Sequence, residues 1–299
     1  MKRLILLFAG ALVIALFTAS CGSDDKDVKP TADFTYSIDG LKVTFTNLSK
    51  DVKSYEWEFG DENTSTEKDP VHTYATYGNK TVSLKAINGK ESDIKSVTIS
   101  LIRPLILIDG DFSDWDEVPA EKLAKSVQPQ NAEYVSLKEF KACADENFIY
   151  LYIKGVKPIA QIAQVFIDID NNPETGWTES YVWLPCGADL LIAGPFLDRF
   201  SWGDIFHFTS EDGGGWNWGT AIAEVTGIVE ISEIIQFPGS DPDMVHAEIS
   251  IARQLIPVTF ANTVKIGFRL NDDGWVGTGH LPQQNSGDLA VPMMDLKMN

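Results

Sequence analysis

The chain has 299 residues, of which 44% are hydrophobic, and a formal net charge of −19 at pH 7. So acidic a surface argues against a nucleic-acid partner, because that kind of binding depends on Lys and Arg side chains that neutralise phosphates. The length is sufficient for two modest domains, each with a core of its own.

The first 20 residues are typical of a lipoprotein signal peptide. Lys2 and Arg3 begin it, residues 4–17 form an apolar run too short to span a bilayer comfortably, and small residues precede Cys21. We therefore expect lipidation of Cys21 and an anchor in an outer membrane, on the side that faces the cell exterior. An ordinary signal peptide followed by an incidental cysteine is the alternative. Loss of Lys2 and Arg3 would leave 22 basic against 43 acidic residues, a net charge of −21.

Residues 21–29 follow as an acidic tether. Residues 22–27 contain no apolar side chain, and this composition predicts a flexible linker. The same cluster resembles the acidic export signal of surface lipoproteins of the Bacteroidota type. A plain solvated linker is the alternative interpretation.

Residues 30–102 alternate apolar and polar side chains over short stretches, which is typical of β-strands. Pairs of turn-forming residues separate the stretches, and no helical pattern interrupts them. Many short strands at this spacing predict an antiparallel β-sandwich. The stretches are residues 32–36, 41–45, 55–59, 81–86 and 97–101.

Three motifs in this segment occur together in one known family. Residues 55–61 read YEWEFGD, residues 69–74 read DPVHTY, and residues 77–82 read YGNKTV. In order and spacing they resemble the W-x-F-G-D, P-x-H-x-Y and G-x-x-x-V motifs of the polycystic kidney disease (PKD) domain. The resemblance implies an immunoglobulin-like sandwich that serves as a spacer or adhesive module.

The PKD resemblance also implies roles for individual residues. Trp57 and Phe59 would fill the core, and Gly60 and Asp61 would form a turn. His72 and Tyr74 would brace that turn by hydrogen bonds rather than act as an acid or a base.

Residues 103–299 predict a second and larger β-sandwich, so that the fold class is all-β with two sandwich domains. Arg103 and Pro104 form a hinge, because proline disfavours continuation of the preceding strand. Residues 229–235 and 252–256 suggest short helices. Strands are expected at 105–108, 135–144, 148–153, 164–169, 188–192, 205–209, 220–225, 244–251 and 264–270.

Several pieces of this segment resemble, in order, the carbohydrate-binding module family 9 and the related DOMON-type sandwiches. They are residues 108–115 (IDGDFSDW), 145–152 (DENFIYLY), 166–177 (FIDIDNNPETGW), 187–190 (GADL) and 248–251 (EISI). The resemblance implies the fold more firmly than a sugar ligand. In the sugar-binding members two aromatic residues clamp the terminal sugar, and that pair has no residue-by-residue counterpart here.

Acidic residues near position 170 suggest a metal site. Asp168 and Asp170 lie on one side of a strand end, because side chains alternate along a strand. Asn172 and Glu174 continue the oxygen ligands, and Asp189 comes from the next strand. Calcium prefers several hard oxygens, whereas no His or Cys is spaced for zinc. We expect a structural Ca²⁺; the alternative is an Asx-rich turn whose carboxylates accept backbone amides.

Seven of the eight tryptophans lie in the second segment. Trp202, Trp216, Trp218 and Trp275 lie in glycine-rich polar loops, and exposed loop aromatics bind sugar rings through the C–H face of the ring. We expect these four to bind a ligand, with Trp216 and Trp218 as a platform if their segment is extended. The alternative is that the tryptophans fill the core, as expected for Trp115.

These features together favour a non-catalytic surface lipoprotein that binds a poly- or oligosaccharide, possesses a PKD spacer and serves an outer-membrane uptake complex. An adhesion or scaffold protein that binds other proteins is the alternative. An enzyme ranks third. The acidic pairs Asp241/Asp243 and Asp272/Asp273 have no fixed separation for a glycosidase, and no nucleophile elbow, zinc-protease motif or phosphate loop occurs.

Two further points stay open at this stage. Cys143 and Cys186 either form a disulfide or remain as two buried free thiols. A haem or redox role, found in some DOMON-type relatives, would need axial Met or His ligands, and the spacing of the available ones does not favour it.

Overall fold

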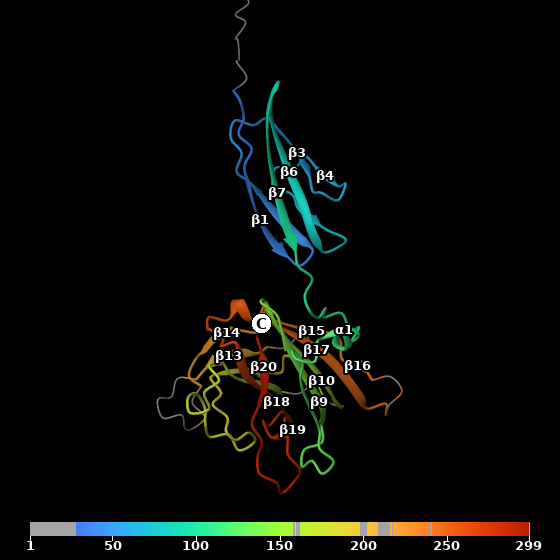
Figure 1. The fold of residues 1–299 in the computed structure, drawn as a ribbon, viewed down its shortest axis with the longest axis vertical. Helices are drawn as coiled ribbons and strands as arrows, with labels where there is room; N and C mark the ends of the chain where they lie inside the picture. Colours follow the sequence, from blue (N-terminus) through green and yellow to red (C-terminus); the bar gives the residue numbers. More distant parts are fainter. Residues whose placement is uncertain are drawn as a thin grey trace, which may run out of the picture. The chain divides into compact units, whose positions relative to one another are not determined.

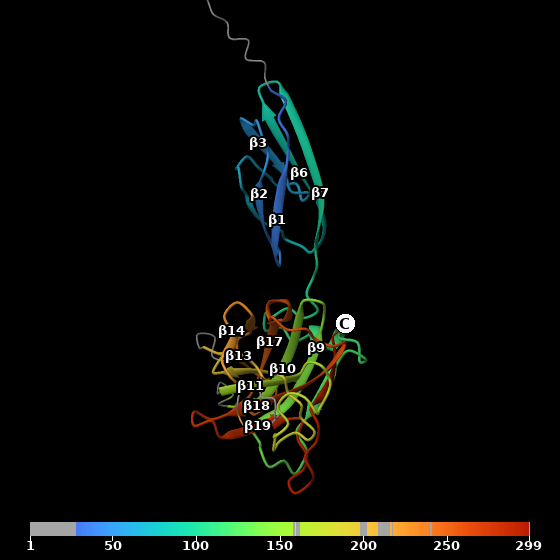
Figure 2. The same ribbon diagram turned by 90° about the vertical axis from the view of Figure 1, so that its left-hand side faces the viewer.

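The computed structural model describes residues 28–157, 159, 162–197, 202–208, 216, 218–237, 239 and 241–298. The chain divides into two compact units, one that ends at Arg103 and one that begins at Pro104. Both are built from antiparallel β-strands (Figures 1 and 2), so the all-β fold class with two sandwiches is confirmed. The signal peptide and Cys21 lie outside the described residues. Within the described part, no helix is long and apolar enough to cross a membrane.

The first unit consists of two small sheets. One sheet has the order β1 (Phe34–Asp39), β2 (Lys42–Asn47) and β5 (Val71–Thr73). The other has the order β4 (Thr64–Ser65), β3 (Ser54–Glu58), β6 (Gly78–Asn88) and β7 (Glu91–Leu101). Strands β4 and β5 escaped prediction because two or three residues are too few to display alternation.

Aromatic side chains fill the space between these two sheets. Trp57 of β3 is buried, and its ring centroid lies 5.3 Å from that of Phe45 and 5.1 Å from that of Phe34. The indole Nε1 of Trp57 donates a hydrogen bond to the Glu67 carbonyl at 3.0 Å. Burial of an aromatic side chain of this size contributes roughly 2–3 kcal/mol, so Trp57 is a main source of the stability of this unit.

The turn after β3 is held by the residues that the motif predicted. His72 Nε2 lies 2.8 Å from Asp61 Oδ2, and the His72 ring stacks on Phe59 with centroids 4.3 Å apart. The Tyr74 hydroxyl donates to the Phe59 carbonyl at 2.9 Å. Gly60 has a φ of +80°, and a Cβ there would lie 2.5 Å from the Thr81 carbonyl oxygen, so only glycine fits. His72 and Tyr74 thus brace the turn.

The second unit stacks two larger sheets. The first has the order β15 (Val229–Ile231), β17 (Met244–Ala252), β10 (Phe148–Val156), β9 (Leu137–Ala144) and β8 (Ala124–Val127), and β16 (Ile235–Gln236) also pairs with β17. The second has the order β14 (Ala221–Glu224), β13 (Asp204–His207), β12 (Leu190–Gly194), β11 (Ile162–Asp168), β18 (Thr263–Asn271) and β19 (Gly277–Leu281). In this second sheet, β20 (Met294–Lys297) also pairs with β18.

Alternate side chains of both sheets meet in one aliphatic core. Leu151 and Ile153 of β10 face Val165 and Ile167 of β11, and all four are fully buried. Because side chains alternate, the residues between them point to the outer faces of the two sheets. Those outer faces are where the polar and aromatic residues of interest lie.

Two local expectations are wrong, and a third is confirmed in part. Residues 105–108 form no strand; their apolar side chains cover the outer face of the six-stranded sheet together with Trp115. Residues 229–235 contain β15 and β16 rather than a helix, because β17 offers an unpaired edge with which their backbone can bond. The helix expected at 252–256 is a single 3₁₀ turn, Arg253–Leu255. The one-turn helix α1 (Asp114–Glu117) was not predicted.

The two cysteines of the second unit are free and buried, so they do not form a disulfide. Cys143 lies in β9, and burial raises the pKa of its thiol far above the ordinary value. Burial also raises the pKa of Cys186 to about 11. Both thiols therefore stay protonated and unreactive at neutral pH.

Candidate functional site

The outer face of the seven-stranded sheet carries the aromatic, amide and carboxylate side chains that form the candidate sites of the second unit. Residues 164, 166 and 168 of β11 point outwards, as do residues 189, 191 and 193 at β12, because the residues between them belong to the core. The segment 169–189 returns across this face and places Trp177 and Trp183 on it, both buried. A second aromatic cluster therefore lies outside the main core.

A pocket of about 290 Å³ opens on this face. Its floor comes from β11, β12 and β13, and tryptophans form its walls. The volume is at the small end of the range for small-molecule sites, which starts at about 300 Å³. The side chains that line it are those of Gln164, Leu191, Ala193, Phe206, Trp216, Trp218 and Trp275, beside Gly219, and none of these described lining residues is charged.

The three tryptophans have different roles in this pocket. Trp216 and Trp275 are 55% and 47% exposed, so each presents indole surface to a ligand. Trp218 is only 5% exposed and forms a wall, with its ring centroid 6.0 Å from that of Trp216 at an angle of 67°. The two rings are therefore arranged edge to face and do not form a flat platform. The Trp218 Nε1 atom is buried and has no hydrogen-bond partner within the described part of the chain.

Trp275 is held at the pocket in a strained conformation. Its φ is +64°, a region that bulky residues rarely occupy. The Asp272 carboxylate stabilises the turn, because its Oδ1 accepts hydrogen bonds from the backbone N–H of Gly274 and of Val276, both at 2.9 Å. Strain of this kind is found chiefly at functional sites.

Two buried amides extend the polar side of the pocket. Gln164 and Asn271 are 2% and 1% exposed, and Asn271 Nδ2 donates to Gln164 Oε1 at 2.9 Å. Asn271 Oδ1 is buried and accepts no hydrogen bond from any described residue. Sequence reasoning missed this pair. The available signal was a polar residue at an outward position of an otherwise apolar strand.

The structure brings together three of the four tryptophans that the sequence suggested for ligand binding. Trp216, Trp218 and Trp275 line the pocket. Trp202 is 62% exposed and lies outside the pocket lining. Trp202 therefore offers a natural control for experiments on the other three.

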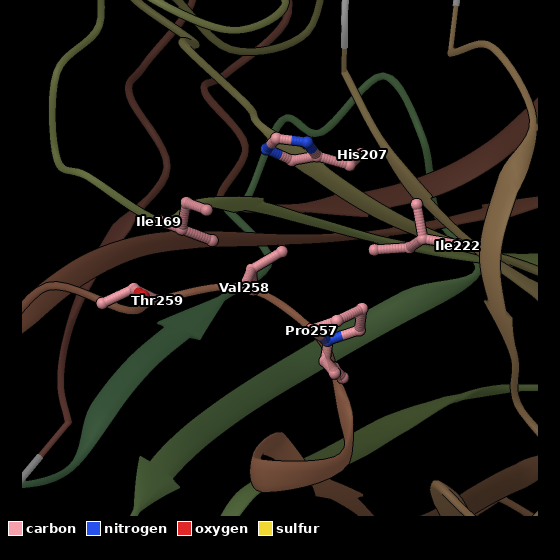
Figure 3. A pocket seen from close by; sticks show the side chains of 7 residues that line it. Ile169, His207, Ile222, Pro257, Val258 and Thr259 are labelled. Atoms are coloured by element: carbon pink, nitrogen blue, oxygen red, sulfur yellow. The ribbon is translucent and has the colours of Figure 1, made fainter.

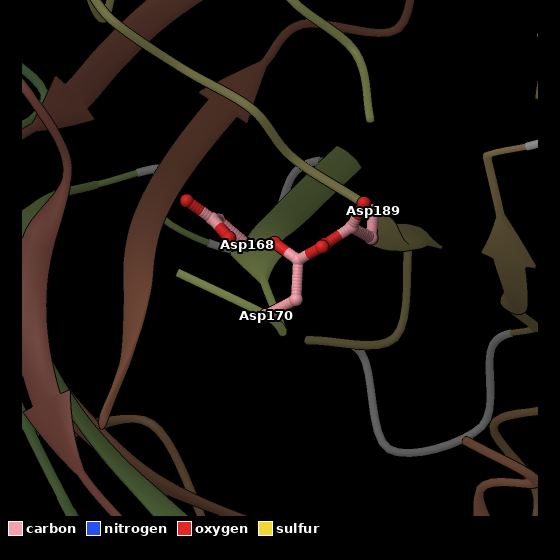
Figure 4. Close-up of side chains that lie close together, drawn as sticks. All are labelled: Asp168, Asp170 and Asp189. Atoms are coloured by element: carbon pink, nitrogen blue, oxygen red, sulfur yellow. The ribbon is translucent and has the colours of Figure 1, made fainter. Parts of the chain in front are cut away.

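An acidic cluster lies on the same outer face, at the ends of β11 and β12. One carboxylate oxygen from each of Asp168, Asp170 and Asp189 lies within 4.8 Å of the others. Figure 4 shows the Asp170 carboxylate between those of Asp168 and Asp189. Asp168 and Asp189 are buried, whereas Asp170 is exposed. The cluster is able to hold a cation.

Backbone amides satisfy only part of this cluster. Asp189 Oδ2 accepts the Ile169 N–H at 3.0 Å, and Asp168 Oδ1 accepts the Asn172 N–H at 3.1 Å. Asp168 Oδ2, by contrast, is buried and finds no partner among the described residues. Asp170 accepts the Thr175 hydroxyl at 3.0 Å.

Burial and mutual repulsion oppose ionisation of the two inner carboxyls. Burial, followed by the charge of Asp189, raises the pKa of Asp168 to about 7. Burial, followed by the charge of Asp170, raises the pKa of Asp189 to about 6. A bound cation would reverse both effects, because an adjacent positive charge favours the ionised form.

The other two residues suggested as metal ligands, Asn172 and Glu174, are both exposed. Asn172 lies beside the cluster, because its backbone N–H donates to Asp168 Oδ1 at 3.1 Å and to Asp170 Oδ1 at 2.9 Å. Asn172 Oδ1 accepts the Glu174 N–H at 3.2 Å, which forms an Asx turn next to the three clustered aspartates. Both residues stay predictions as metal ligands.

A second depression, of about 410 Å³, adjoins the acidic cluster through Ile169. Figure 3 shows His207 on one side of it and Pro257 and Val258 on the other. Its lining is otherwise aliphatic apart from Thr259. Among its described lining residues there is no group of polar side chains that would orient a ligand.

Comparisons with known proteins identify the first unit. Residues 25–101 match the family model of the PKD domain. The pre-pro-metalloprotease PrtV of Vibrio cholerae is 34% identical over 84 residues, which cover 26% of this chain and 9% of that protein. The first unit is thus a PKD domain, and the chain spans only a small part of the length of this relative.

Solved structures similar to the chain include two isolated PKD domains. The PKD1 domain of Vibrio cholerae PrtV is 35% identical and covers 25% of this chain and 98% of its own, with a TM-score of 0.24. The PKD1 domain of Vibrio anguillarum Epp is 32% identical and covers 26% and 99%, with a TM-score of 0.25. A structure from work on carbohydrate-binding modules of the β-sandwich superfamily is 14% identical and covers 81% and 96%, with a TM-score of 0.28.

Proposed function

We propose that the second unit binds a neutral glycan in the pocket of Trp216, Trp218 and Trp275, without catalysis, and that the PKD domain is its spacer. The observation that supports this most directly is the pairing, in one pocket, of the exposed indole surface of Trp216 and Trp275 with the polar amide of Gln164. Sugars are the ligands that present both an apolar ring face and a set of hydroxyls.

The chemistry of the pocket matches such a ligand on both counts. The C–H face of a sugar ring packs on the open indoles of Trp216 and Trp275. Gln164 is the lining residue with an amide side chain, and Asn271 holds that amide because its Nδ2 donates to Gln164 Oε1 at 2.9 Å. A sugar hydroxyl that bonds to such a fixed polar group gains about 0.5–1.5 kcal/mol.

The charge of the site selects among sugars. The described lining residues include no Lys or Arg, and the whole chain has a net charge of −19. Anionic polysaccharides are repelled by such a protein, whereas neutral polymers are not. None of the described lining residues has a carboxyl group of the kind that serves as acid or base in glycoside hydrolysis, and the proposal is one of binding alone.

The acidic cluster is proposed to hold a structural Ca²⁺. Asp168, Asp170 and Asp189 supply hard oxygen atoms of the kind that calcium prefers. The buried, unpartnered Asp168 Oδ2 is the observation that favours a cation over a set of hydrogen-bonded turns. The ion would join the end of β11 to the start of β12.

The location of the protein is also a proposal. The residues that precede Cys21 and the acidic tether that follows it support a lipid anchor in an outer membrane, with the protein on the cell exterior. A glycan-binding protein in that position would present polysaccharide to an outer-membrane uptake complex.

Affinity electrophoresis of the chain from Gly22 onward, with calcium, tests the glycan proposal. Gels that contain a panel of neutral and acidic polysaccharides are compared. We expect retardation by at least one neutral polymer, and loss of that retardation in Trp216→Ala and in Trp275→Ala. Trp202→Ala is the matched control, because this tryptophan is equally exposed but lies outside the pocket lining.

The possible results separate the alternatives. An equal loss of retardation in Trp202→Ala would show that the binding site is not this pocket. If no polymer retards the wild-type chain, glycan binding is wrong and the adhesion or scaffold function becomes the better account.

A further inference from the structure

We infer that a divalent cation in the cluster of Asp168, Asp170 and Asp189 sets the arrangement of the tryptophan pocket, so that glycan affinity depends on a cation that does not touch the sugar. This inference rests on the proposed function. Four features of the structure support it: two shared strands, one buried tryptophan, one close backbone approach and one unpartnered carboxylate oxygen.

The cluster and the pocket share two neighbouring strands. On β11, Gln164 lines the pocket, Phe166 belongs to the aromatic cluster, and Asp168 ends the strand on the same face. Asp189 immediately precedes β12, and residues 191 and 193 of that strand line the pocket. A cation at Asp168 and Asp189 would therefore join the two strands that form the pocket floor.

Trp177 connects the acidic loop to the pocket walls. Its ring lies 5.1 Å from that of Trp216 at 87°, and 6.1 Å from that of Trp218. Its backbone N–H donates to the Ala188 carbonyl at 2.7 Å, and the Ala188 N–H donates back at 3.2 Å. Trp177 thus packs against both pocket tryptophans while it is bonded to the residue next to Asp189. It is a positioning residue and does not line the pocket itself.

The backbone between the cluster and Trp177 has little freedom. Gly176 has a φ of +65°, and a Cβ on it would lie 2.6 Å from Asp189 Oδ1. The chain therefore passes directly over the Asp189 carboxylate just before Trp177. A change in the position of that carboxylate is transmitted to the tryptophan by contact.

Without a cation, the electrostatics of the cluster are unfavourable. Three carboxylates lie together, and Asp168 Oδ2 is buried without a partner among the described residues. When all three carboxyls are ionised, repulsion between like charges opposes their placement within 4.8 Å of one another. A cation would offset this repulsion and hold the Asp170 carboxylate between those of Asp168 and Asp189, the arrangement that Figure 4 shows.

The test uses the chain from Gly22 onward with calcium chloride or with EGTA. We expect calcium to raise the unfolding temperature of the second unit and to tighten glycan retardation on the order of tenfold, a typical coupling between two sites. Asp170→Asn loses both effects and is expected to fold, because this side chain is exposed. Trp177→Phe keeps the rise in unfolding temperature but loses the tightening.

A second measurement is independent of any sugar. N-bromosuccinimide oxidises exposed indoles, and mass spectrometry assigns the rate to each tryptophan. Calcium is expected to slow the oxidation of Trp216 several-fold and to leave that of Trp202 unchanged, since Trp216 is in ring contact with Trp177 and lines the pocket whereas Trp202 is not in the pocket lining. In Trp177→Phe the calcium effect on Trp216 disappears.

The results test three claims separately: cation binding, its coupling to the pocket, and glycan binding. An unfolding temperature that calcium does not change overturns the inference. If calcium raises that temperature while glycan retardation and Trp216 oxidation stay the same, the coupling is wrong and the proposed function stands. If no polymer is retarded with or without calcium, the proposed function is wrong, and the oxidation rates alone then support or overturn the link between cation and pocket.

Discussion

His280 shows at the scale of one residue how burial controls ionisation. It is 4% exposed, and its ring meets Trp183 edge-on with centroids 5.9 Å apart. Its Nε2 atom is buried and has no hydrogen-bond partner in the described structure. Burial, followed by the charge of Arg269, lowers the pKa of His280 to about 4. This side chain is therefore neutral in the folded protein.

We predict that His280→Phe makes the second unit less sensitive to acid. The unfolded chain, with a histidine pKa of about 6.5, binds a proton that the folded chain does not bind until about pH 4. Stability contributed by this group is therefore lost as the pH falls through that window, by roughly 3 kcal/mol. Phenylalanine preserves the ring contact and removes the titration. Urea unfolding at pH 8 and at pH 4.5 measures how much stability the wild-type chain and the variant each lose on acidification. Equal losses would show that His280 is not neutral when folded.

Gly267 of β18 allows the Trp183 indole to pack directly against the strand backbone. A Cβ at this position of β18 would lie 2.7 Å from the indole of Trp183, which is fully buried. We predict that Gly267→Ala destabilises the second unit by about 1–3 kcal/mol, the usual cost of overpacking. In a Trp183→Phe background the same substitution should cost less, because the smaller ring leaves room. Denaturant unfolding of the four proteins measures this coupling, and an equal cost in both backgrounds would contradict the steric explanation.

At the scale of elements, one buried carboxylate joins two segments that are distant in sequence. Glu248 of β17 is fully buried. Its Oε1 accepts the indole N–H of Trp115 at 3.1 Å, and its Oε2 accepts the backbone N–H of Gly110 at 3.2 Å. The motifs at residues 108–115 and 248–251 are therefore two halves of one structural clamp. Burial raises the pKa of Glu248 to about 7, and the two hydrogen bonds partly oppose this rise.

We predict that Trp115→Phe destabilises the second unit more at pH 8 than at pH 5. The substitution removes a donor to a buried carboxylate, a loss of about 1–3 kcal/mol that is larger for a charged group. Glu248 contributes stability that is present below its unfolded pKa and is lost as the pH rises through about 7, where the folded group ionises. As the pH rises, the Trp115→Phe variant loses more free energy of unfolding than the wild-type chain does, because the ionised Glu248 needs the hydrogen bond from the Trp115 indole. Equal costs at the two pH values, measured by urea unfolding, would contradict this.

Sequence alone predicts most long strands and misses what depends on their partners. Alternation located β18, whose residues 264, 266, 268 and 270 face the core, whereas a continuous apolar run located β10, which is buried on both faces. Residues 229–235 were misassigned because their apolar spacing suits both a helix and a strand, and the free edge of β17 decides between them. Residues 105–108 are apolar for another reason: they cover a sheet rather than join it.

The candidate site is predictable to a similar extent. Residue type and motif pointed to the loop tryptophans and to Asp168, Asp170 and Asp189, which the fold brings together. Gln164 and Asn271 were not predictable, because a polar residue on the outer face of a strand normally meets water, and only the covering aromatic loops bury this pair. Trp202 shows the converse, since its sequence context resembles that of the others but the residue is not part of the pocket lining.

At the scale of the whole molecule, the two units have separate aromatic and aliphatic cores. We predict that Trp57→Ala, which removes the central side chain of the PKD domain at a cost of about 3–5 kcal/mol, lowers only one unfolding transition. The other transition, and its response to calcium, should stay as in the wild-type chain. Calorimetry with calcium and with EGTA checks this, and a shift of both transitions would contradict independent units.

The clamp at Glu248 also has a kinetic consequence. Trp115 and Glu248 are 133 residues apart, and β10 pairs with β17 along its whole length. A chain that emerges from its N-terminus must therefore wait for β17 with one edge of β10 unpaired. An apolar strand edge left open for that time is prone to aggregation. The second unit is thus expected to need a holding chaperone until its last strands arrive, whereas the PKD domain, completed first, is not.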